Sequence, residues 1–163
     1  WDELGYHFVI GNGSGSGDGQ VEVGPRWPIQ KHGAHAKTPD NRYNDYGIGI
    51  CLVGNFMETN PTPAQMHSLA KLVAFLEERY RIPSDSVIRH KDTKPTDCPG
   101  VNLNIGLVRT MATRILVDAG EQIPTDSAYA DATTRPTDDD SNAFPTTAPI
   151  AATDLMIEVP TAR

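Results

Sequence analysis

The sequence predicts an α/β domain with a mixed central β-sheet flanked by helices. Short apolar segments with strand character lie at residues 5–10, 20–24, 47–54 and 87–89. Segments with the 3.6-residue apolar period of amphipathic helices lie at residues 63–80 and 104–119. Strands interleaved with helices in this way are typical of α/β domains.

The first predicted strand, residues 5–10, places Tyr6, Phe8 and Ile10 on one face and His7 and Val9 on the other. A glycine-rich run follows and predicts a hairpin turn into the alternating residues 20–24. The next stretch, residues 25–46, is rich in Pro, His, Asn and Gly and has no periodicity. A long irregular loop of this kind usually carries function, because a rigid scaffold can hold a site on its loops.

The continuous apolar run at residues 47–54 predicts a central strand. Thr62, Pro63 and Gln65 then predict the start of a helix, with Thr62 as N-cap and Gln65 completing a capping box. The expected inward face of this helix is Met66, Leu69, Val73, Leu76 and Tyr80. For the second helix it is Leu107, Val108, Met111, Ile115 and Leu116, with Gly120 as the stop.

The composition changes after this second helix. Residues 121–149 are dominated by Thr, Ala, Pro, Asp and Ser, so we expect this segment to be disordered. Residues 151–159 are more apolar, which is compatible with a sticky end, a docking strand or the start of a further region. We therefore divide the chain into a domain at residues 1–119 and an acidic linker or tail at residues 120–163.

The formal charge of −7 is unevenly distributed. Residues 1–120 carry 12 Lys and Arg against 13 Asp and Glu, whereas residues 121–163 carry 2 against 8. A nearly neutral domain argues against a nucleic-acid partner, which requires a basic face. There is no run of 18 apolar residues, so the sequence predicts no membrane span.

His90 and Cys98 are the most informative side chains of the chain. His90 ends the apolar segment at residues 87–89, and Cys98 follows after a short polar loop that Pro99 and Gly100 close. Imidazole and thiolate are both good zinc ligands, and a catalytic zinc site needs one more protein ligand and an open position. A surface histidine with an unreactive cysteine is the simpler interpretation of this pair when it is taken alone.

Together with the segments 5–10, 32–36 and 47–54 that precede it in order, this pair makes the chain resemble a known family. The chain is similar to the zinc-dependent N-acetylmuramoyl-L-alanine amidases, which include phage amidase-type lysozymes and peptidoglycan recognition proteins. The resemblance covers about residues 1–118 and lacks the opening strand and helix of the family. We therefore expect the domain to be N-terminally incomplete, with its targeting segment upstream.

The resemblance implies a set of site residues. His90 and Cys98 match two of the three zinc ligands, and the third is a histidine on the opening strand, which lies upstream of Trp1. Tyr6 matches a catalytic tyrosine, although a strand tyrosine is more often a packing residue. Thr96 falls where phage-type members have a catalytic Lys and catalytic recognition proteins have Thr. In the same way, His35 matches a cleft histidine that contacts the substrate.

Two further residues follow from the resemblance and from the composition. Asn44 resembles an asparagine that fixes the long loop in the family. Cys51 lies in an apolar run and is expected to be a buried small hydrophobe, with a disulfide to Cys98 as the alternative. His7 and His32 are expected to be structural or exposed.

The expected function is zinc-dependent hydrolysis of the amide bond between N-acetylmuramic acid and L-alanine in bacterial peptidoglycan. The alternatives are a peptidoglycan-binding module without catalysis and, more weakly, a Cys98 nucleophile with His90 as its base. We expect Zn²⁺ as cofactor, peptidoglycan or a muropeptide as substrate, a monomer, and a location in the cell envelope or outside the cell.

Overall fold

The computed structural model describes residues 3–121 and 152–158, and its elements alternate between strands and helices as the sequence predicts. In chain order they are β1 (Phe8–Ile10), β2 (Val21–Val23), α1 (Arg42–Tyr46), β3 (Gly47–Val53), α2 (Pro63–Tyr80), η1 (Ser84–Ser86), β4 (Val87–Arg89), η2 (His90–Asp92), α3 (Ile105–Glu121) and β5 (Ala152–Glu158).

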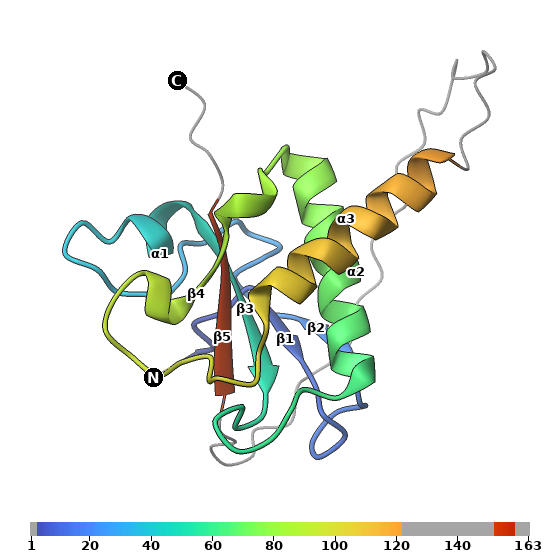
Figure 1. Ribbon diagram of the computed structural model, residues 1–163. Helices are drawn as coiled ribbons and strands as arrows, with labels where there is room; N and C mark the ends of the chain where they lie inside the picture. Colours follow the sequence, from blue (N-terminus) through green and yellow to red (C-terminus); the bar gives the residue numbers. More distant parts are fainter. Residues whose placement is uncertain (1–2, 122–151, 159–163) are drawn as a thin grey trace, which may run out of the picture.

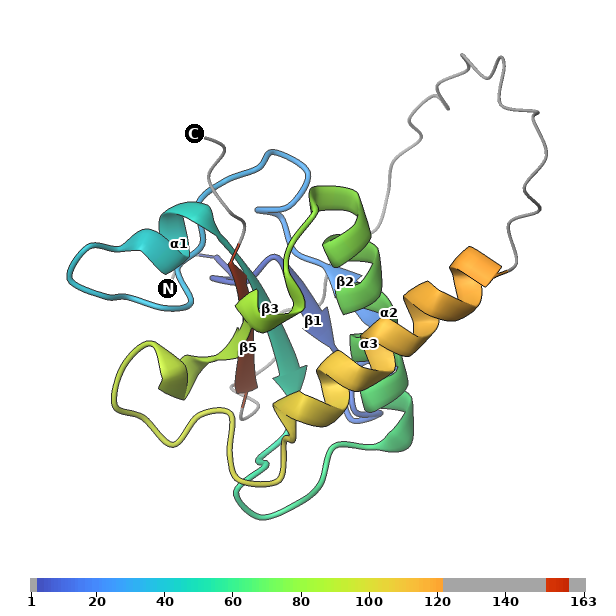
Figure 2. The ribbon, with the colours of Figure 1, turned by 45° about the horizontal axis from the view of Figure 1, so that its top comes forward.

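The five strands form one mixed sheet in the order β2-β1-β3-β5-β4. β1 and β3 are parallel, and the other neighbouring pairs are antiparallel. Helices α2 and α3 lie together on one side of this sheet (Figures 1 and 2). The predicted fold class, a mixed sheet flanked by helices, is confirmed.

The hydrophobic core lies between the sheet and the two helices. β3 contributes Ile48, Ile50 and Leu52, which alternate with residues that face the opposite side of the sheet. Burying such a face is the main source of stability for a domain of this size. The core residues of β1 and the helices are Phe8, Ile10, Leu69, Val73, Leu76, Val108 and Ala112.

The start of α2 follows the local signals in the sequence. The Thr62 side chain accepts a hydrogen bond from the backbone N–H of Gln65, and the Gln65 side chain accepts one from the backbone N–H of Thr62. This reciprocal capping box is confirmed. The helix ends at Tyr80, the last residue of its predicted inward face.

The elements differ from the predictions in several places, and one is that α3 continues through the predicted stop at Gly120 to Glu121. β1 begins at Phe8 and not at Gly5, because the preceding residues bond to the long loop and to β3 through Gly5 and His7. The loop at residues 25–46 contains the short helix α1. On α3, the prediction that Leu107 faces inward is wrong: it is 49% exposed, and Val108 with Ala112 one turn later supply the buried stripe.

Only part of the predicted linker or tail at residues 120–163 lies among the described residues. Within it, residues 152–158 form β5, which pairs with β3 on one side and β4 on the other. A docking strand is therefore the alternative that the structure shows for this segment. The predicted disorder of residues 121–149 concerns residues that, apart from the end of α3, lie outside the described part of the chain.

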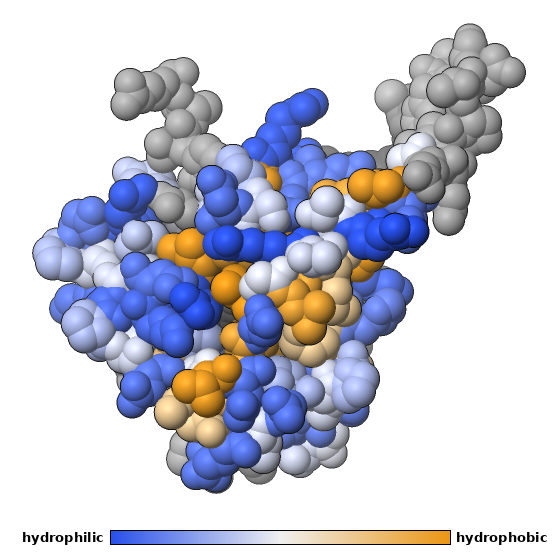
Figure 3. All heavy atoms as spheres, viewed as in Figure 1, coloured by the Kyte–Doolittle hydropathy of each residue, from blue (hydrophilic) through white to orange (hydrophobic). Residues whose placement is uncertain are grey.

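The molecular surface is mostly hydrophilic on the face seen in Figure 1, with apolar residues gathered near its middle (Figure 3). Exposed large apolar side chains include Val101, Leu107 and Val117. Among the described helices, none is both long and apolar enough to cross a membrane.

Candidate active site

The long loop before β3 is fixed to the sheet by Asn44. Its buried side-chain Oδ1 accepts hydrogen bonds from the backbone N–H groups of His35 and Ala36, both at 2.8 Å. The backbone carbonyl of Asn44 accepts a third hydrogen bond from Gly33 at 2.8 Å. Asn44 therefore holds the His35 segment in one conformation, which is the role that the resemblance implies for it.

The imidazole ring of His35 lies on two glycines. A Cβ atom built on Gly33 would be 2.3 Å from His35 Cδ2, and one built on Gly49 of β3 would be 2.4 Å from the same atom. No side chain larger than hydrogen fits at either position without a shift. The ring of His35, which is 5% exposed, can therefore lie flat against the sheet.

Tyr6 and His35 come together in the structure. Their ring centroids are 6.0 Å apart with an interplanar angle of 24°, so the two rings are stacked. His7 approaches the other side of this pair, with its ring centroid 5.8 Å from that of His35. Of the three residues predicted to act in catalysis, Tyr6 and His35 thus form one cluster.

His7 is a structural histidine, as expected. Its Nδ1 accepts a hydrogen bond from the Gly49 N–H at 3.0 Å, so the ring proton is on Nε2, which donates to the Lys31 carbonyl at 3.0 Å. Burial lowers the pKa of His7, and the nearby positive charge of Arg26 acts in the same direction, while the bond to Lys31 opposes them. The ring is therefore held neutral between β3 and the long loop.

Arg26 connects the start of the described chain with the long loop. Its guanidinium donates to the carbonyls of Leu4 and His32 and to the carboxylate of Glu3. The ammonium of Lys31 also contacts Glu3. His32 is exposed, as expected, and its Nδ1 lies 3.2 Å from the carboxylate of Asp45.

His90 and Cys98 are brought together by the loop between them. The backbone N–H of Lys91 donates to the carbonyl of Cys98 at 3.0 Å, which closes the loop directly beside His90. His90 is buried, and Cys98 is half-buried. Cys51 and Cys98 both lie in the described part of the chain, and the alternative of a disulfide between them is not observed there.

Two hydrogen-bonded contacts stabilise this loop. Arg89 donates to both carboxylate oxygens of Asp92, at 3.0 and 2.8 Å, and these bonds lower the pKa of Asp92. Thr96 Oγ1 accepts the backbone N–H of Cys98 at 3.3 Å. Thr96 therefore lies next to Cys98, one of the two predicted ligands.

The sheet register relates the two clusters. Gly49, against which His35 lies, and Ile88, two residues before His90, both pair with Met156 of β5. They are thus at the same level of the sheet, two strand spacings or about 10 Å apart. The Tyr6–His35 cluster and the His90–Cys98 pair flank β5 from opposite sides.

The described residues include side chains of the types that bind metal ions, but no group of them is large enough to hold one. Within residues 3–121 and 152–158, no group of three or more His, Cys, Asp or Glu side chains is arranged to hold a metal ion. His90 and Cys98 are suitable zinc ligands by type, and a catalytic zinc site takes three protein ligands. By residue type, His90 and Cys98 could supply two of these three ligands.

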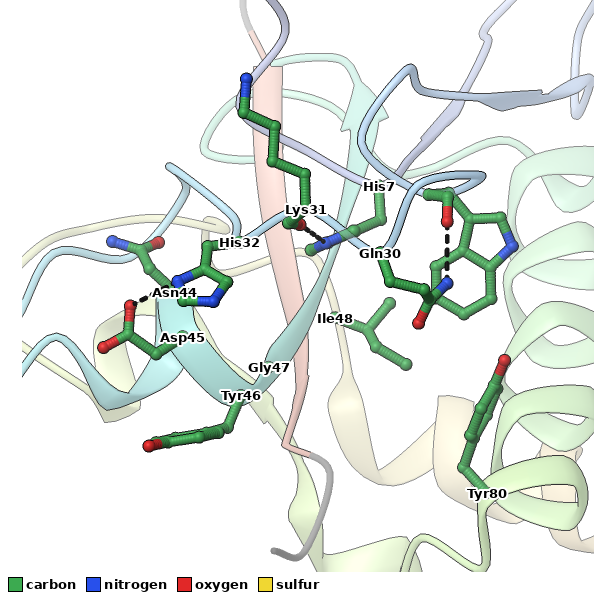
Figure 4. Close-up of a pocket in the computed structure, with 11 residues that line it drawn as sticks. His7, Gln30, Lys31, His32, Asn44, Asp45, Tyr46, Gly47, Ile48 and Tyr80 are labelled. Atoms are coloured by element: carbon green, nitrogen blue, oxygen red, sulfur yellow. Dashed lines mark hydrogen bonds and ion pairs between the residues drawn. The ribbon is translucent and has the colours of Figure 1, made fainter.

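A pocket of about 190 Å³ is lined in part by His7 (Figure 4). It is formed by the loop at residues 27–32, the junction between α1 and β3, and Tyr80 at the end of α2. None of the five predicted site residues lines it. The pocket therefore includes His7 and Asn44 but none of the predicted site residues.

Sequence reasoning missed two features of the site. The glycines under His35 could have been suspected from Gly49, which interrupts an otherwise apolar strand. The Arg89–Asp92 pair has the short spacing of a local contact but resembles any surface ion pair in the sequence.

Comparison with known proteins places the chain in a family. The sequence profile described as N-acetylmuramoyl-L-alanine amidase matches residues 1–101. A peptidoglycan-recognition protein of Drosophila melanogaster is 39% identical over 103 residues, covering 62% of this chain and 50% of that protein. An endolysin of Enterobacteria phage T3 is 40% identical over 109 residues, covering 63% of each.

Among solved structures, the N-acetylmuramoyl-L-alanine amidase LysC from Clostridium intestinale URNW superposes with a TM-score of 0.53 at 32% identity. The match covers 69% of this chain and 67% of that one. The chain spans between half and two thirds of the length of the two curated relatives, the recognition protein and the endolysin.

Proposed function

Because this chain belongs to the N-acetylmuramoyl-L-alanine amidase family, we propose that it hydrolyses the amide bond between N-acetylmuramic acid and L-alanine in bacterial peptidoglycan. The observation that supports this proposal is the backbone hydrogen bond from Lys91 to Cys98, which brings the backbone of Cys98 next to the residue that follows His90. The substrate places the site of action in the cell envelope or outside the cell.

The proposed cofactor is zinc, with His90 and Cys98 as two of its ligands. Bound at such a site, zinc supplies an acidified water and polarises a carbonyl group. The third ligand stays a prediction: a histidine that precedes Trp1 in the intact protein.

The protein groups around the site suit the stabilisation of an oxyanion. The phenol of Tyr6 can donate a hydrogen bond to the oxygen of the tetrahedral intermediate, and its ring is oriented by stacking on His35. Thr96 accepts the Cys98 N–H through Oγ1, so its hydroxyl hydrogen stays available as a second donor. The backbone of His35 is held by Asn44, and the proposed role of His35 is to contact the substrate next to Tyr6.

The second candidate function is binding of peptidoglycan without hydrolysis. The shortage of a third ligand in the described part of the chain favours it, and one relative is named as a peptidoglycan-recognition protein. The two functions differ in their products. An enzyme releases soluble stem peptides with a new L-alanine amino terminus, whereas a binding module sediments with the wall and releases none.

The deciding experiment compares Cys98→Ser with Cys51→Ser in the intact protein. Serine is a poor zinc ligand at neutral pH, so Cys98→Ser should lose both zinc and peptide release. Cys51 is buried in β3, and the matched Cys51→Ser should keep about one zinc per chain. Hydrolysis that survives Cys98→Ser and resists chelators would overturn the zinc mechanism.

A further inference from the structure

Arg109 of α3 is hydrogen-bonded to the segment that leads into His90. Its Nε and Nη2 donate to the carbonyl of Val87 at 3.0 and 2.7 Å, and Nη2 also donates to the carbonyl of Asp85 at 3.0 Å. Asp85 lies in η1 and Val87 begins β4, so one guanidinium bridges two consecutive elements. Because a guanidinium is planar and its donors have a fixed geometry, these bonds hold both carbonyls in a defined position relative to α3.

The location of β4 in the sheet makes such a contact important. β4 is the last strand in the sheet order, and within the described residues it has a neighbouring strand on one side only. It is also only three residues long. A segment with so few backbone partners opens locally unless other contacts hold it. The bonds from Arg109 are contacts of this kind, and they come from a helix and not from the sheet.

His90 lies between two points of attachment. It follows Val87 by three residues, which is about 10 Å along an extended strand. On the other side of His90, the backbone N–H of Lys91 donates to the carbonyl of Cys98. One attachment thus joins the strand before His90 to α3, and the other joins the residue after it to the loop that carries Cys98.

A buried carboxyl group also interacts with the guanidinium of Arg109. Glu77 of α2 is 6% exposed, and its Oε1 is buried without a hydrogen-bond partner among the described residues. Burial raises the pKa of Glu77, while a hydrogen bond with Ser84 and the positive charge of Arg109 oppose this. Arg109 therefore has an electrostatic effect on Glu77 in addition to its bonds to η1 and β4.

We propose that Arg109 is a positioning residue for His90: by holding the start of β4 to α3, it fixes the place at which the strand presents the imidazole ring. The importance of this for zinc binding and hydrolysis rests on the proposed function, whereas the attachment of β4 to α3 does not. The Tyr6–His35 cluster lies on β3 and the long loop, so it should be independent of Arg109.

Hydrogen exchange of the metal-free full chain tests this role. Arg109→Met keeps an apolar stem and removes every donor of the side chain. Arg114→Met is the matched control, because Arg114 lies on the same helix and pairs with Asp118 at the surface. The hydrogen-bonded amides within residues 89–93 should exchange at least about tenfold faster in Arg109→Met than in the control. Those of α2 and β3 should exchange at equal rates in both.

Two results of this experiment would overturn the proposal. Equal rates at residues 89–93 in Arg109→Met and Arg114→Met would show that Arg109 does not hold β4. A rise of the same size in α2 and β3 would show that Arg109 stabilises the whole domain and has no particular effect on the segment around His90.

A Glu77→Gln background separates the bonds of Arg109 from its charge. Glutamine keeps the shape of the side chain and removes the buried carboxyl group, so the loss of the Arg109 charge no longer leaves Glu77 without it. If Arg109 acts through the carbonyls of η1 and β4, the difference between Arg109→Met and Arg114→Met at residues 89–93 should persist in this background. If the difference disappears, Arg109 acts by compensating the charge of Glu77, and the proposal is wrong.

Cobalt(II) binding separates this inference from the proposed function. The thiolate-to-cobalt absorption of the intact protein reports on Cys98 as a ligand. The affinity measured in this way should fall at least about tenfold in Arg109→Met and stay unchanged in Arg114→Met, since residues that orient metal ligands contribute about this much to metal affinity. Equal affinity in both variants would overturn the positioning role. An intact wild-type protein that binds no cobalt would contradict the zinc function, and the exchange data would still decide the role of Arg109.

Discussion

His35 and Gly49 are in such close contact that the ring of the histidine occupies the space where a side chain at position 49 would begin. The contact joins the long loop to the central strand β3. It also places His35 beside Tyr6, with which it stacks. The absence of a side chain at one strand position thus determines where a predicted substrate-contacting residue lies.

Gly49→Ala should therefore displace His35 and reduce peptidoglycan hydrolysis. The new Cβ would be 2.4 Å from the ring, and relief of such an overlap in a packed region costs about 1–3 kcal/mol. Urea unfolding and peptide release measure the two effects. Gly120→Ala is the control, since nothing lies within 4 Å of its Cβ and alanine favours a helix. A Gly49→Ala protein with unchanged activity would show that the packing of His35 against position 49 is unimportant for the reaction.

How much of the fold could be predicted from the sequence depends on how far apart along the chain the contacting residues lie. α2 was predictable to the residue because its capping box and its Pro63 act within one turn. β5 could not be predicted as a central strand, since its pairing joins Cys51 to Asp154, about a hundred residues further along the chain. The local sequence pattern indicates a strand at residues 151–159, but it does not identify the strands with which this segment pairs.

The same distinction applies to the site. The closeness of His90 and Cys98 could be expected, because only a short loop separates them. Gly49 could suggest from the sequence that another group packs closely on β3, but a glycine does not indicate that this group is the ring of His35. The roles of Tyr6, Thr96 and His35 in catalysis stay predictions.

Asn44 offers a second test of the loop that carries His35. Asn44→Ala would leave two N–H groups, of His35 and Ala36, without their acceptor, at a cost of about 1–3 kcal/mol. Asn44→Asp keeps an oxygen at the same place and should retain more stability and more activity than the alanine variant. Thermal unfolding with peptide release would measure this order. The reverse order would contradict the role of Asn44 as an acceptor.

The neutral state of His7 predicts a dependence of stability on pH. Because burial lowers the pKa of His7 in the folded protein, the unfolded chain takes up a proton first as pH falls below about 6.5. The contribution of His7 is thus complete above that pH and is lost progressively below it, by at most about 1.4 kcal/mol per pH unit.

Urea unfolding between pH 5 and 7.5 in wild type and His7→Gln measures this effect. Burial raises the pKa of Glu77, which favours the folded state as pH falls and so acts in the opposite direction. Since Glu77 is present in both proteins, the difference between their slopes isolates His7. His67→Gln, which changes an exposed helical histidine, should retain the wild-type slope. Equal slopes in all three proteins would mean that His7 takes up its proton in the folded state too.

Tyr6→Phe separates the catalytic role of Tyr6 from a packing role. Phenylalanine keeps the ring that stacks on His35 and removes only the hydroxyl, so the folded structure should be retained. If the hydroxyl donates to the oxyanion, kcat should fall by about ten- to a thousandfold with little change in KM. Tyr43→Phe in α1, outside the cluster, is the control. An unchanged kcat in Tyr6→Phe would leave Tyr6 as a packing residue and transfer the role of oxyanion donor to Thr96, whose hydroxyl lies beside Cys98.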